Sequence, residues 1–67
     1  MEIFLNGKGK KLNDDIKNLE QCVDALPGNN EGVIVELNGK IIKYGERESI
    51  LLKDGDKIEL IQFMGGG

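Results

Sequence analysis

Two Asn-Gly dipeptides, at residues 6–7 and 38–39, constrain the fold of this 67-residue chain more than any other feature. Asparagine followed by glycine supplies the positive backbone φ angles that a two-residue hairpin turn requires. Each dipeptide joins two segments of strand-like composition, which are residues 1–6 and 8–12 for the first and residues 33–37 and 40–43 for the second. The sequence therefore predicts two β-hairpins. The lysine-rich segment of the first is suited to an edge strand.

A single helix is predicted between the two hairpins. Four apolar residues recur there at helical spacing and form one stripe: Ile16, Leu19, Val23 and Leu26. The polar residues 13–15 precede the stripe and are predicted to cap the helix, and Pro27-Gly28 is predicted to end it. Cys22 lies at the flank of the stripe, where we expect a half-buried packing role.

The remaining elements complete an α+β pattern. Residues 45–49 are polar and predicted to be irregular, residues 50–52 form a brief apolar stretch, and Asp54-Gly55-Asp56 is a predicted turn. Residues 57–63 make the last and strongest predicted strand. The order β-β-α-β-β-β predicts a β-grasp domain over residues 1–64, in which one helix covers one face of a mixed sheet of four to five strands.

Alternation along the strands assigns side chains to the two faces of that sheet. The side chains predicted to point at the helix are Ile3, Leu5, Val33, Val35, Leu37, Ile58 and Leu60. Those predicted to point away from it are Phe4, Ile34, Ile61 and Phe63. Because a chain this short has no second layer to cover the latter set, we expect it to form an apolar patch that docks a partner.

Composition excludes several classes of function. Histidine is absent and Cys22 is the only cysteine, so the chain has no disulfide framework, no Cys/His zinc cluster and no catalytic triad. Nine basic against twelve acidic residues give a net charge of -3, which argues against nucleic-acid binding. No apolar run approaches the length of about 18 residues that a membrane span needs. A lone cysteine and a start without a secretory pattern favour a cytoplasmic protein.

The sequence closes with three glycines, Gly65, Gly66 and Gly67. Glycine has the largest backbone entropy to lose on ordering, so three of them add nothing to a folded core. A backbone without Cβ atoms can, however, pass through a narrow channel into another protein. We predict that residues 65–67 form a flexible tail and that the terminal carboxylate of Gly67 is its reactive group.

These features resemble the ThiS family, the sulfur carriers of thiamine biosynthesis. The resemblance covers the Asp-Gly-Asp turn at residues 54–56, the apolar strand after it and the terminal glycines, in that order. The segments Ile3-Phe4-Leu5-Asn6-Gly7 and Val33-Ile34-Val35-Glu36-Leu37-Asn38-Gly39 match as well. Residues 43–47 depart from the family, whose members often carry Pro-Arg and a nearby aromatic residue there; here the segment reads Lys-Tyr-Gly-Glu-Arg.

The resemblance implies a ubiquitin-like carrier that is not itself an enzyme. A ThiF-like adenylyltransferase would use ATP to adenylate Gly67. A cysteine desulfurase or another persulfide donor would supply sulfur for a thiocarboxylate, and a ThiG-like thiazole synthase would receive it. Gly65 and Gly66 would be the threading segment. The residues implied in docking are Phe4, Ile34, Ile61, Phe63 and Met64. The chain itself would bind neither cofactor nor metal.

Three alternatives stay open on the sequence. The sulfur-donating MoaD subunit of molybdopterin synthase has the same tail chemistry, although its family is usually longer and has prolines before its terminal glycines. A ubiquitin-like protein modifier would end as an isopeptide on a target lysine. A plain interaction module would make no use of the tail at all.

Overall fold

The last strand of the chain lies in the middle of the sheet. In the computed structural model, which describes residues 1–28 and 30–62, five strands form one mixed sheet. In chain order they are β1 (Glu2–Leu5), β2 (Lys8–Lys11), β3 (Ile34–Leu37), β4 (Lys40–Ile42) and β5 (Lys57–Ile61). Their order across the sheet is β2-β1-β5-β3-β4. β1 and β5 are parallel, and the other neighbouring pairs are antiparallel.

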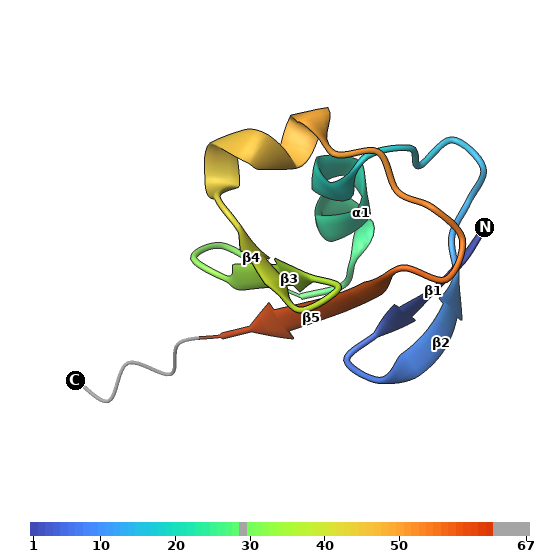
Figure 1. Ribbon diagram of the computed structural model, residues 1–67, viewed down its shortest axis with the longest axis horizontal. Coiled ribbons are helices and arrows are strands. Elements are labelled where there is room, and N and C mark those ends of the chain that lie inside the picture. Colours follow the sequence, from blue (N-terminus) through green and yellow to red (C-terminus); the bar gives the residue numbers. More distant parts are fainter. Residues whose placement is uncertain (29, 63–67) are drawn as a thin grey trace.

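One face of the sheet is covered. The α-helix α1 (Leu19–Ala25) and the 3-10 helix η1 (Tyr44–Ser49) lie on the same side of the sheet (Figure 1). Neither of them has the length and apolar character needed to cross a membrane. The predicted β-grasp architecture, a mixed sheet with one α-helix on one face, is confirmed. The strand bounds differ from the predicted ones by one or two residues, and Phe63 lies outside the described residues.

Both Asn-Gly dipeptides adopt the predicted turn conformation. Asn6 and Gly7 have φ angles of 50° and 84°, and Asn38 and Gly39 have φ angles of 52° and 85°. Positive φ at both central residues is the requirement of the hairpin turn that matches strand twist. The antiparallel registers place Leu5 opposite Lys8 and Leu37 opposite Lys40.

The helix begins later than predicted. The polar residues 13–15 do not cap it; Asn18 does. The Gln21 N–H donates to Oδ1 of Asn18 at 2.8 Å, and the Asn18 N–H donates to Oε1 of Gln21 at 3.1 Å. This reciprocal arrangement is a capping box, in which side chains satisfy the N–H groups that the first helical turn leaves free. Ile16 therefore precedes the helix, although it still packs against the core.

A tertiary contact explains this late start. The segment before α1 pairs with residues 50–52: the Leu52 N–H donates to the Lys17 carbonyl and the Leu19 N–H to the Ile50 carbonyl, each at 2.9 Å. Backbone groups used in this pairing cannot also make helical hydrogen bonds. The helix ends as predicted, at Leu26, whose ψ of 145° is extended, just before Pro27-Gly28.

Two local predictions are wrong. Residues 45–49, predicted to be irregular, lie within η1. Cys22, predicted to be half-buried, is 0% exposed, because a helix that starts at Leu19 turns positions 19, 22, 23 and 26 inward together.

The core lies between the sheet and the helices. All seven side chains predicted to face the helix belong to it or pack against it. Ile3 of β1, Val35 of β3 and Ile58 of β5 are 0% exposed. Leu12 and Leu52, outside the regular elements, close the ends of the core.

Candidate functional site

The predicted reactive segment follows directly from β5. Five predicted site residues lie outside the described residues: Gly65, Gly66 and Gly67, and the docking residues Phe63 and Met64. β5 is the last strand before these residues in the sequence, and Gln62 is the last residue described. The described parts of the candidate site are therefore β5 and the face of the sheet that points away from α1.

β5 is held on both sides. Toward β3 it has four antiparallel register pairs, from Leu37 opposite Ile58 to Ile34 opposite Ile61. Toward β1, the first Asn-Gly turn adds two hydrogen bonds of 2.9 Å: the Asn6 N–H donates to the Ile58 carbonyl, and the Leu60 N–H donates to Oδ1 of Asn6. The asparagine that forms the turn thus also fixes β5 at Leu60, one residue before the last residue of the strand.

The second turn holds the beginning of the same strand. Oδ1 of Asn38 accepts a hydrogen bond from the Lys57 N–H at 2.9 Å, and its Nδ2 donates to Oδ1 of Asp56 at 3.0 Å. Oδ2 of Asp56 accepts from the Lys53 N–H at 2.8 Å. Asp56 is only 9% exposed, and these bonds satisfy a carboxylate that would be costly to bury alone.

The face of the sheet that points away from α1, here called the open face, carries the three described docking residues. Phe4 is 41% exposed, Ile61 is 39% exposed and Ile34 is half-buried. Ile34 lies directly opposite Ile61. Phe4, however, lies opposite Lys57, four residues before Ile61, which is roughly 13 Å along the strand. The open face thus has two separate apolar regions and not the single patch that the sequence predicted.

The sequence reasoning missed one apolar residue on this face. Ile41 is 64% exposed and lies opposite Glu36 on the edge strand β4. Two consecutive isoleucines, Ile41 and Ile42, hide the alternation of β4. Counting the register outward from the Asn-Gly turn would have assigned Ile41 to the open face, because Leu37 pairs with Lys40 across it.

Two carboxylates lie between the apolar regions. Glu36 on β3 is directly opposite Glu59 on β5, and the next pair toward the tail is Ile34 with Ile61. Opposed residues on one face of an antiparallel pair have Cβ atoms about 4.5–5.5 Å apart. Neither glutamate forms an ion pair within the described part of the chain.

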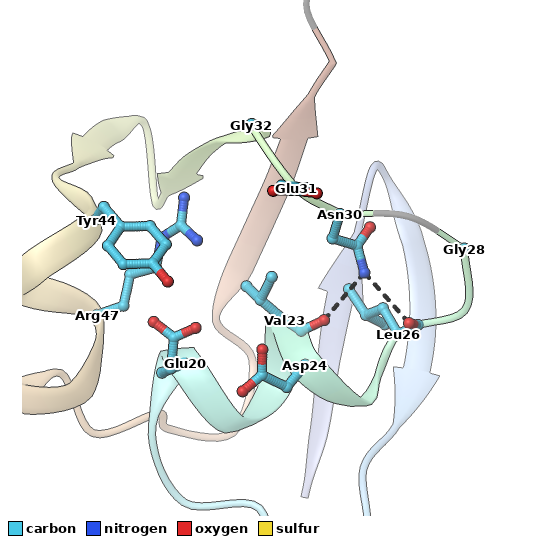
Figure 2. A pocket seen from close by; sticks show the side chains of 10 residues that line it. All are labelled: Glu20, Val23, Asp24, Leu26, Gly28, Asn30, Glu31, Gly32, Tyr44 and Arg47. Carbon is cyan, nitrogen blue, oxygen red and sulfur yellow. Dashed lines mark hydrogen bonds between the residues drawn. The ribbon is translucent and has the colours of Figure 1, made fainter.

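A hollow of about 310 Å³ lies on the helix side of the molecule, between α1, η1 and the loop before β3 (Figure 2). Arg47 lines it and is only 5% exposed. Its Nη2 donates to the Val33 carbonyl at 2.9 Å, its guanidinium lies 4.9 Å from the centroid of the Tyr44 ring, and its Nε has no hydrogen-bond partner. Arg47 therefore ties η1 to the start of β3. Tyr44 and Arg47, the residues that depart from the family pattern, are stacked on each other.

The side chains that could serve as a nucleophile or as metal ligands are Cys22 and the acidic residues. Burial raises the pKa of the Cys22 thiol, with the opposing charge of Lys10 a smaller influence, so the reactive thiolate is disfavoured. In residues 1–28 and 30–62, no three His, Cys, Asp or Glu side chains are grouped so that they could hold a metal ion.

The mixed sheet, the single α-helix on one face of it and the central position of the last strand define a ubiquitin-like β-grasp protein. Comparison with known proteins identifies the family within this class. The sequence profile of the ThiS family matches residues 2–67, and the chain belongs to the ThiS family.

Sequence similarity to individual proteins supports this assignment. The chain is 36% identical over 63 residues to the sulfur carrier protein ThiS of Bacillus subtilis (strain 168), covering 94% of this chain and 96% of that protein. It is 28% identical over 67 residues to a thiazole synthase of Paramagnetospirillum magneticum (strain ATCC 700264 / AMB-1), covering all of this chain but 20% of that protein.

Solved structures agree as well. The crystal structure of the thiamine biosynthesis protein ThiS from Geobacter metallireducens superposes with a TM-score of 0.83 at 36% identity, over 100% of both chains. A solution structure of a thiamine biosynthesis protein from the same organism gives a TM-score of 0.78 at 35% identity, over 100% of this chain and 88% of that one.

Proposed function

We propose that this chain is a sulfur carrier of thiamine biosynthesis that carries sulfur as a thiocarboxylate on Gly67. The observation that carries the proposal is the ThiS family match over residues 2–67, which extends through the terminal glycines. The 36% identity to the ThiS sulfur carrier of Bacillus subtilis, over nearly the full length of both proteins, supports it. In this role the chain is a co-substrate of other enzymes and not an enzyme itself.

The chemistry requires an activated carboxylate. A carboxylate is a poor electrophile because its negative charge repels nucleophiles. An oxygen of the Gly67 carboxylate attacks the α-phosphorus of ATP and releases pyrophosphate, so that the acyl carbon gains AMP as its leaving group. A persulfide sulfur then attacks that carbon and AMP leaves with its bonding electrons. A second thiol cleaves the S–S bond of the acyl disulfide, forming a disulfide with the donor sulfur and leaving the thiocarboxylate on Gly67.

Three partners follow from this scheme: a ThiF-like adenylyltransferase that uses ATP, a cysteine desulfurase or another persulfide donor, and a ThiG-like thiazole synthase. The match between the whole chain and one fifth of a thiazole synthase supports the last of these. We further propose that the carrier works in the cytoplasm, where ATP is available, and that it binds neither metal nor cofactor itself.

Among the described residues, we propose Phe4, Ile34 and Ile61 for docking. We propose the same role for Phe63 and Met64, which follow β5 in the sequence. Partly exposed apolar side chains on an uncovered sheet face are suited to a partner surface. Gly65 and Gly66 would pass into the partner's channel, since neither carries a side chain. This assignment leaves the covered face free to provide stability alone.

The test is the intact mass of the chain after incubation with the adenylyltransferase, ATP and a sulfur donor. We expect the mass increase of one oxygen replaced by sulfur, located at Gly67 by fragmentation. A truncated chain without Gly66 and Gly67 is the control and should show no increase while keeping its melting temperature. Conjugates to other proteins that survive reduction and denaturation would instead support the protein-modifier alternative.

The pathway is tested by complementation. Expression of the chain in a strain that lacks its own ThiS should restore growth without thiamine. Rescue of a molybdopterin-synthase small-subunit mutant, without rescue of the thiamine defect, would overturn the assignment to thiamine biosynthesis in favour of the MoaD alternative.

A further inference from the structure

The charged pair on the open face is unfavourable in the free protein. Glu36 and Glu59 are directly opposed in the β3–β5 register, and like charges in that position destabilise a sheet. No cation in the described chain forms an ion pair with either. Lys57, two residues before Glu59 on the same face, lies beside Phe4 and is not bonded to the pair.

Covering this face would make the pair more costly. Ile34 and Ile61 occupy the adjacent register pair, and Ile41 lies opposite Glu36 on its other side. A partner that buries these isoleucines also removes the two carboxylates from water. Buried carboxylates require a cation or several hydrogen bonds, because their desolvation is not recovered otherwise. A partner surface that offers the glutamates a cation or hydrogen-bond donors is therefore favoured over a purely apolar one.

We propose that the open face docks the ATP-using activating enzyme through a basic side chain of that enzyme, which lies over Glu36 and Glu59 between apolar contacts to Ile34, Ile61 and Ile41. This inference rests on the proposed function. The activating enzyme must bring two anions together, the terminal carboxylate of this chain and the phosphates of ATP, so cations are needed around the entrance to its active site. The net charge of -3 on the chain favours approach to such a surface.

In this role, Glu36 and Glu59 determine which partner binds, and their mutual repulsion lowers the stability of the free protein. Removing their charge should relieve repulsion in the free protein and weaken the complex. Opposite signs for stability and for affinity distinguish this role from a structural one, in which both quantities would fall together.

The experiment is calorimetric titration of the purified adenylyltransferase of the same organism, without ATP, with the wild-type chain and with Glu36→Gln/Glu59→Gln. We expect the double variant to bind at least about tenfold more weakly, with a weaker dependence on NaCl, and to melt no lower than wild type. Glu46→Gln/Glu48→Gln, which removes the same two charges from exposed positions on η1, is the matched control and should bind as wild type does. Glu59→Lys should weaken binding further, through repulsion of the basic side chain.

Several results would overturn the inference. Unchanged affinity and salt dependence in the double variant would do so, and so would a loss of affinity that follows a lowered melting temperature. Weaker binding to the thiazole synthase alone would assign the pair to that enzyme instead. Thiocarboxylate formation on the wild-type chain, measured separately, tests the proposed function. If the wild-type chain gains sulfur and the double variant binds the enzyme as tightly as wild type, only the role of the glutamates is refuted.

Discussion

The two faces of the sheet are formed by the same five strands but differ in the burial and charge of their side chains. On the covered face, alternate side chains of β5 pack in or against the core: Ile58 is 0% exposed and Leu60 is partly buried. On the open face, Glu59 and Ile61 alternate with them and meet no second layer. Burial on the first face stabilises the domain, whereas the second face combines opposed charges with exposed isoleucines. The comparison teaches that the period-two alternation of one strand separates the side chains that stabilise the core from those that are left exposed for the proposed docking.

The largest effect is expected for a truncation on the covered face. Ile58→Ala should lower the free energy of unfolding by about 3 kcal/mol, because it opens a cavity in a fully buried position. Urea denaturation measures this loss. Ile61→Ala, three residues along the same strand on the open face, is the matched control and should cost less than about 1 kcal/mol. Equal losses for the two variants would contradict the separation of the faces.

A smaller loss is expected at the buried arginine on the helix side. Arg47→Ala removes the donor to the Val33 carbonyl and the packing of a side chain that is 5% exposed, and we expect a cost of about 2 kcal/mol. Thermal unfolding would show it as a clear fall in melting temperature. Tyr44→Ala removes only the exposed half of the stacked pair and should cost about 0.5 kcal/mol. A larger loss at Tyr44 than at Arg47 would show that stacking, and not the tie to β3, is the main contribution.

The next effect is expected at the second Asn-Gly turn, where Asn38 contributes both side-chain hydrogen bonds and a positive φ angle. Asn38→Gly keeps the positive φ angle but loses the bonds to Asp56 and Lys57, so about 1 kcal/mol should be lost. Asn38→Ala should lose about 1 kcal/mol more, because alanine is strained at that φ. Chemical denaturation of the two variants separates the side-chain bonds from the backbone conformation. Identical stabilities would mean that the left-handed conformation contributes nothing.

The smallest effect on stability is expected at Phe4. Phe4→Ser should change the free energy of unfolding by about 0.5 kcal/mol, since the ring is partly exposed already. The rate of thiocarboxylate formation at limiting chain concentration should nevertheless fall, if the open face is where the enzyme docks. A normal rate would remove Phe4 from the docking surface and confine docking to the region of Ile34 and Ile61.

The sequence predicted what local chemistry determines. Each Asn-Gly dipeptide produced its hairpin, and alternation assigned the core residues such as Val35 and Ile58 to the correct face. The helix start at Leu19 was missed because it depends on pairing between residues 17–19 and 50–52, a contact made in space. The burial of Arg47 was missed for a similar reason: its donor reaches the Val33 carbonyl, whose position is set by the sheet.

The candidate site was predicted less completely than the fold. Phe4, Ile34 and Ile61 do share the open face, but their separation depends on the parallel register of β1 against β5. A parallel pair has no turn between its strands from which the register can be counted. The opposition of Glu36 and Glu59 also joins strands distant in sequence, and it became visible only with the register of β3 against β5.

The central position of β5 has a mechanical consequence. A force applied along β5 would act on the axis of a strand with a neighbour on each side, and the hydrogen bonds to those neighbours run across the direction of that force. Such a load is shared by all of these bonds at once, so the strand must slide as a whole before any one bond is released. An edge strand pulled sideways would instead peel open from one end. A pull along β5 is therefore opposed by both neighbouring strands together, and the domain resists unfolding from that end of the sheet.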